Sequence, residues 1–68
     1  MTKLTENQHR KFLDMMLVYA KDLKSVGQEI TPERKERIAD NVKIARDVGY
    51  ETLADEYVTK FREQGIDL

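Results

Sequence analysis

The sequence contains no cysteine and no tryptophan, and only one proline and one histidine occur among its 68 residues. Without cysteine, the chain can form neither disulfide bonds nor thiolate metal sites. A chain of this length buries only about 60% of its unfolded surface. Its fold must therefore depend on close packing of its elements, with self-association or a partner as a further source of stability.

Long apolar runs and an excess of one charge are also missing. Twelve basic and 13 acidic side chains give a net charge of −1, and 40% of the residues are hydrophobic. This composition is too apolar for a disordered tail and too charged for a membrane span, and it offers no general attraction to nucleic acid. The opening Met1–Glu6 segment lacks the apolar run of a secretion signal. We expect one soluble, cytoplasmic domain over residues 1–68.

The glycines and the proline stand where helices are expected to end and begin. Gly27, Gly49 and Gly65 each follow a stretch with apolar residues at helical spacing, as is typical of the left-handed residue after a helix. Pro32 follows Thr31, a pairing that favours a threonine N-cap with proline in the first turn. Thr5 and Gln8 have the spacing of a capping box. These start and end positions predict helices over 6–26, 32–48 and 51–64.

Each predicted helix has an apolar stripe. The stripe of the first helix consists of Phe12, Met16, Tyr19, Leu23 and Val26, flanked by Leu13, Leu17 and Ala20. The other two present Ile38, Val42 and Ala45, and then Leu53, Ala54, Tyr57, Val58 and Phe61. We expect the tyrosines to lie at the core edge with their hydroxyls in water. The short connections predict an all-α, compact three-helix bundle.

The segment Asn41–Val58 resembles the helix-turn-helix motif of DNA-binding proteins. Ala45 supplies the small residue four positions before Gly49, and Val48 and Tyr50 supply the apolar flanks. The resemblance implies a nucleic-acid-binding protein that uses residues 41–58. One departure is Asp55, because the motif buries an apolar residue at that position. A second departure is that the second helix of the motif would bring its acidic side chains close to the negatively charged phosphate backbone of DNA.

Basic residues for such a role gather in the second helix. They are Arg34, Lys35, Arg37, Lys43 and Arg46. Acidic residues are interleaved with them, and Glu33 and Arg37 have the i,i+4 spacing of an ion pair. This pattern favours a solvated helix face, and nucleic-acid binding is the alternative interpretation.

Residues for catalysis are few. Glu6 and His9 have the Glu-x-x-His spacing of di-iron helical bundles, but a second histidine is absent from the sequence. We expect His9 to be a half-buried residue near a helix end. Each glycine is already assigned to a helix end, which leaves none for a phosphate-binding loop. We therefore expect no enzyme activity and no cofactor.

Surfaces for a protein partner are the remaining feature. The apolar candidates are Met15, Val18, Tyr19 and Ile44, and the acidic candidates on the last helix are Glu51, Asp55 and Glu56. Methionine suits a surface that adapts to another protein. The sequence therefore predicts a non-catalytic regulator, inhibitor or adaptor that binds another protein. The partner is unidentified, and a second copy of this chain is the other option.

Overall fold

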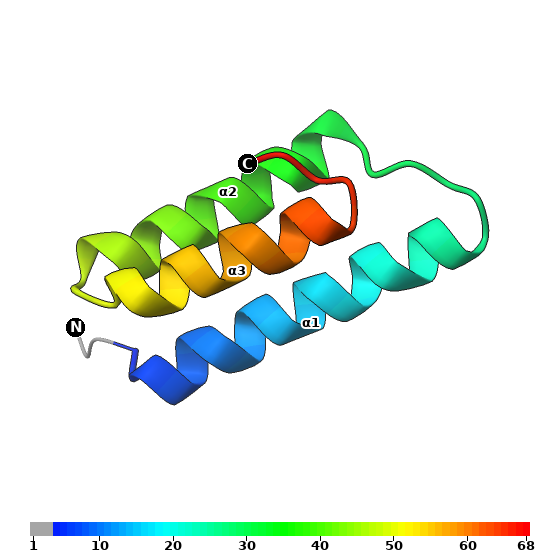
Figure 1. Ribbon diagram of the computed structural model, residues 1–68. Helices are drawn as coiled ribbons and strands as arrows, with labels where there is room; N and C mark the ends of the chain where they lie inside the picture. Colours follow the sequence, from blue (N-terminus) through cyan, green and yellow to red (C-terminus); the bar gives the residue numbers. More distant parts are fainter. Residues whose placement is uncertain (1–3) are drawn as a thin grey trace.

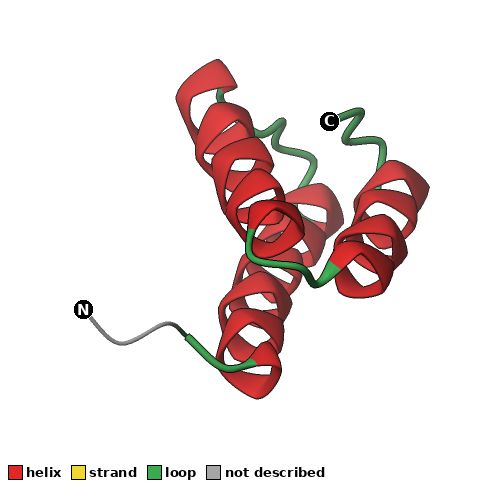
Figure 2. Cartoon of the chain, turned by 90° about the vertical axis from the view of Figure 1, so that its left-hand side faces the viewer, coloured by secondary structure: helices red, strands yellow, loops and turns green. Residues whose placement is uncertain are grey.

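The computed structural model describes residues 4–68 and consists of three helices joined by short loops. Helix α1 spans Glu6–Ser25, α2 spans Pro32–Asp47 and α3 spans Glu51–Glu63. Each ends one residue before the predicted boundary, because the last predicted residue is the C-cap. Helices α1 and α3 run in the same direction, and α2 runs in the opposite direction (Figure 1). Every helix contacts the other two, and the end-on view shows a triangular arrangement (Figure 2). The three-helix prediction is confirmed.

The starts of α1 and α2 are capped as the sequence predicts. The backbone N–H of Gln8 donates to the Thr5 hydroxyl at 3.2 Å, and the Thr5 N–H donates to Gln8 Oε1 at 2.8 Å. These two bonds form the capping box of α1. At α2, the Thr31 hydroxyl accepts from the Arg34 N–H at 3.3 Å. Pro32 occupies the first turn there, where the N–H that it lacks is not needed.

The glycine after α3 closes the fold at its carboxyl end. Gly65 has φ +81°, which is in the left-handed region. This conformation lets the Ile66 N–H donate to the Phe61 carbonyl at 3.0 Å, as in a Schellman motif. Ile66 is thereby folded back onto the core and is buried. Gly49 makes the equivalent turn between α2 and α3, where the Tyr50 N–H donates to the Ala45 carbonyl at 2.9 Å.

The core lies along the line where the three helices meet. Its buried hydrophobic residues are Leu13, Leu17, Ala20, Ile38, Val42, Ala45, Leu53, Ala54, Tyr57, Phe61 and Ile66. The faces predicted for α2 and α3 are confirmed, with Val58 half-buried at the edge. Ala45 and Ala54 are completely buried, which lets the backbones of α2 and α3 approach closely. None of the helices formed by the described residues is long and apolar enough to cross a membrane.

The stripe predicted for the first helix is wrong in its orientation. Phe12 is 48% exposed, Tyr19 40% and Val26 67%, whereas Leu13 and Leu17 are buried. The buried face is thus turned by about 100°, or one residue, from the predicted one. The physical reason is that α1 carries two adjacent apolar stripes. Helices α2 and α3 bury one of them and cover the predicted one only in part, at Met16 and Leu23. Val26 also stands beyond the last turn of α1.

A polar link joins α1 to α3 at the edge of this core. Tyr57 is completely buried, and its hydroxyl donates to the Asp14 carboxylate. The prediction that this hydroxyl lies in water is therefore wrong. Burial, reinforced by the Asp14 charge, raises the pKa of Tyr57 to about 12. The link brings together two residues that are 43 positions apart in the sequence.

Candidate functional site

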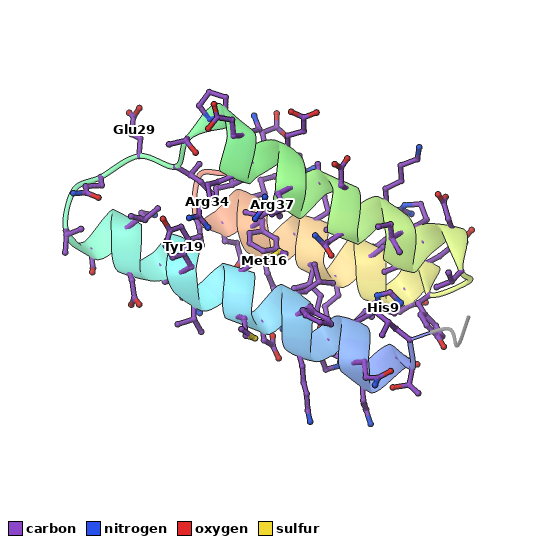
Figure 3. The ribbon with its side chains drawn as sticks, turned by 180° about the vertical axis from the view of Figure 1, so that it is seen from behind. His9, Met16, Tyr19, Glu29, Arg34 and Arg37 are labelled. Atoms are coloured by element: carbon purple, nitrogen blue, oxygen red, sulfur yellow. The ribbon has the colours of Figure 1, made fainter. Side chains whose placement is uncertain are left out.

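A groove runs between α1 and α2, on the side of the molecule away from α3. It has a volume of about 340 Å³ and is lined by Met15, Met16 and Tyr19 of α1 and by Arg34, Arg37 and Ile38 of α2. Figure 3 looks onto this side and shows Met16 and Tyr19 facing Arg34 and Arg37 across the boundary between the two helices. The groove thus combines residues from the predicted protein-binding set with residues from the predicted nucleic-acid-binding set.

The Arg34 side chain lies against the aromatic ring of Tyr19. Its guanidinium carbon is 4.8 Å from the ring centroid, which is cation–π geometry. The stacking orients the guanidinium over the groove while its N–H groups stay available to a ligand. Among residues 4–68, neither Arg34 nor Arg37 forms an ion pair. The predicted Glu33–Arg37 pair is therefore not formed.

A second hollow extends the groove toward the start of α1. It has a volume of about 360 Å³ and is lined by Gln8, Lys11, Phe12 and Met15. Met15 belongs to both hollows and is 68% exposed. Phe12, Met15 and Tyr19 therefore form one exposed apolar strip along α1, at the i, i+3, i+7 spacing of a helix face.

Ile44 extends the same surface on α2. It is exposed and stands seven residues, about two helical turns, after Arg37, which places the two on one side of α2. We call this surface the α1–α2 face; it comprises Phe12, Met15, Tyr19, Arg34, Arg37 and Ile44. Neither Ile44 nor the exposed Val18 lines either hollow. Val18 is left out of the face because it stands about 100° around α1 from Tyr19, on the side away from Met16.

The acidic candidates lie on α3 and are mostly engaged within the chain. Glu56 accepts a hydrogen bond from Arg10 of α1 at 2.8 Å and lies 3.2 Å from the Lys60 ammonium. The hydrogen bond from Arg10, helped by Lys60, lowers the pKa of Glu56. Asp55 pairs with Arg46 of α2 at 2.7 Å. Of the three predicted carboxylates, only Glu51 is without an ion pair among the described residues.

The basic candidates of α2 do not form one surface. Arg34 and Arg37 line the α1–α2 groove, but Lys35 lines a different hollow with Lys24 and Ile66. Arg46 is paired with Asp55. After the turn at Gly49, α3 runs back beside α2 (Figure 1), whereas the helices of a helix-turn-helix cross at about 90–120°. The basic residues are thus dispersed around a helical hairpin.

His9 is part of the core rather than of an open site. Its side chain is buried, and its ring packs edge-on against Tyr50 with 5.6 Å between the ring centroids. It is more buried than the half-buried position predicted for it. No group of three or more potential metal ligands occurs within residues 4–68.

Two features of the face were missed by the sequence reasoning. Phe12 was assigned to the core, and the stacking of Arg34 on Tyr19 joins residues that were assigned to different functions. The spacing of Phe12 to Met15 and Tyr19 indicates that the three share one helix face, and this pattern could have placed Phe12 on the surface. No pattern in the sequence predicts the stacking, because it depends on how α1 and α2 are placed side by side.

Comparisons with known proteins assign no function to the α1–α2 face. No protein family model matches this chain, and no curated protein or solved structure matches it.

Proposed function

We propose that this chain is a non-catalytic protein-binding module that uses the α1–α2 face to contact its partner. The observation that carries the proposal is the groove of about 340 Å³ in which exposed Met15 and Tyr19 lie beside Arg34 and Arg37. Methionine, aromatic residues and arginine are the residue types enriched in protein interfaces. A regulator, inhibitor or adaptor works by such a contact alone.

The energetics of the face support the same proposal. Phe12 and Met15 contribute little to the stability of the fold, because about half or more of each residue is exposed to water. Covering them on binding would remove apolar surface from water, at about 25 cal/mol per Å². Arginine and tyrosine at the centre of such a surface are the residues that most often dominate binding energy.

The test is affinity capture with matched variants from cells that carry this gene. Wild-type protein, Met15→Asp and the control Thr59→Asp are compared, since Thr59 is exposed on α3 outside the face. Both sites are exposed, so circular dichroism is expected to show all three folded. We expect one set of captured proteins to be lost with Met15→Asp and retained with Thr59→Asp. Equal capture by both variants, or no specific capture at all, would contradict the proposal.

Nucleic-acid binding is checked with the same protein. A fluorescence-anisotropy titration with duplex DNA at low salt is expected to show no saturable binding. Saturable, salt-sensitive binding that is lost with Arg34→Ala plus Arg37→Ala would instead favour the helix-turn-helix alternative, because phosphate contacts depend steeply on salt.

A further inference from the structure

We propose that the ligand of the α1–α2 face is an acidic amphipathic helix of another protein. This inference rests on the proposed function, since it specifies the partner of the same face. Three observations carry it: the shape of the groove, the unpaired arginines beside it, and the poor fit of a second copy of this chain.

The shape favours a helix over an extended peptide. A peptide that binds as a β-strand needs backbone partners, which a sheet edge provides. Helices α1 and α2 use their backbone groups internally, and no strand occurs within residues 4–68. A helix satisfies its own backbone and needs only side-chain contacts. From Gln8 to Tyr19 the two hollows follow α1 for eleven residue steps, or about 16 Å, so a helix of about three turns would cover them.

The charge of the face favours acidic side chains. Arg34 and Arg37 border the apolar strip at one end and Lys11 at the other. None of these three residues forms an ion pair in the part of the chain that the structure describes. Carboxylates accept paired hydrogen bonds from a guanidinium. The stacking of Arg34 on Tyr19 at 4.8 Å reduces the side-chain freedom that binding would remove.

The positive charge of the face also disfavours a second copy of this chain as its ligand. In a two-fold dimer the same patch meets itself, so a contact centred on the apolar strip would bring Arg34 and Arg37 of one copy to the Lys11 end of the other. Like charges in a contact are costly. The acidic residues Asp55 and Glu56 are on α3 and are already paired within the chain, so they do not supply the missing complement.

The experiment selects helices that bind the α1–α2 face. A displayed library of single helices has apolar residues at i, i+3, i+4 and i+7 and randomised residues at the flanking positions. It is selected on the wild-type protein and counter-selected on Met15→Asp. We expect the surviving sequences to carry Asp and Glu at the flanks. Sequences with basic or uncharged flanks, or the absence of survivors, would overturn the inference.

A charge swap then tests the arginines directly. Arg34→Glu plus Arg37→Glu is compared with the control Lys43→Glu plus Arg62→Glu, which makes the same change of net charge at exposed positions outside the groove. We expect a selected acidic peptide to bind the groove variant about tenfold more weakly or worse, and the control like the wild type. Equal losses in both variants would refute a specific role. If the groove variant is unfolded by circular dichroism, Arg34→Gln plus Arg37→Gln replaces it.

Two further outcomes separate this inference from the proposed function. If capture from cells depends on Met15 but no acidic helix is selected, the acidic helix is wrong and the binding face stands. If sedimentation shows a dimer that Met15→Asp dissociates, the ligand is a second copy, and the acidic helix is again wrong.

Discussion

Replacing Tyr57 by phenylalanine isolates the one hydroxyl that links α1 to α3 in the core. At neutral pH the hydroxyl donates to the Asp14 carboxylate from a completely buried ring. The carboxylate is exposed, so water can replace the lost donor. We therefore expect Tyr57→Phe to lower the free energy of unfolding by about 1–2 kcal/mol. In a domain of this size, each kcal/mol lowers the melting temperature by about 4–8 °C.

The same hydroxyl lowers the free energy of unfolding of the wild type at high pH, and Tyr57→Phe lacks this effect. The pKa of Tyr57 rises from 10.0 to about 12 on folding, through burial and the Asp14 charge. A raised pKa in the folded state means that its stabilising contribution is complete below pH 10 and is lost as the pH rises through about 12. Each tenfold change in proton affinity corresponds to about 1.4 kcal/mol. The rise in the pKa from 10.0 to about 12 therefore lowers the free energy of unfolding by about 2–3 kcal/mol once Tyr57 is ionised. This loss exceeds the advantage at neutral pH.

The two stability curves should therefore cross. Urea unfolding followed by circular dichroism, from neutral pH to above pH 11, is expected to show the wild type more stable at first and Tyr57→Phe more stable at the end. Tyr19→Phe is the matched control, because Tyr19 is partly exposed and belongs to the α1–α2 face. Curves for wild type and Tyr57→Phe that stay parallel through the whole range would refute the reasoning.

Three further substitutions test the packing and the turns, each by urea unfolding. Gly49→Ala forces a side chain into φ +107° and is expected to cost about 1–2 kcal/mol; an unchanged midpoint would mean that the turn adopts another conformation. Ala54→Leu adds volume at a completely buried position and is expected to cost about 1–3 kcal/mol, and a stabilised variant would reveal unfilled space beside α2. Met15→Ser removes an exposed side chain and is expected to change stability by less than about 0.5 kcal/mol, so a larger loss would place Met15 in the core.

The sequence was sufficient for the helices because their boundaries depend on local chemistry. Gly49 and Gly65 adopt the positive φ that their positions predicted, and Thr5 and Thr31 cap the helices that follow them. Each of these residues acts on backbone groups a few positions away. The faces of α2 and α3 were equally clear, because each carries a single apolar stripe.

The orientation of α1 and the composition of the α1–α2 face required the structure. Two apolar stripes lie side by side on α1, and residue spacing alone does not select the one that α2 and α3 cover. The choice of Leu13 and Leu17 over Phe12 depends on the packed neighbours. The meeting of Tyr19 with Arg34 likewise depends on two helices that are separated by a loop.

The bond between Tyr57 and Asp14 also fixes the register of the bundle. The apolar contacts of α1 and α3 are non-directional, and a helix that slides along its axis can exchange one set of them for another. A slip of one turn, about 5.4 Å, would carry the Asp14 carboxylate away from the Tyr57 hydroxyl and lose this hydrogen bond to a charged group, at a cost of about 1–2 kcal/mol. This directional bond thus favours one alignment of α1 and α3 among several of similar hydrophobic energy.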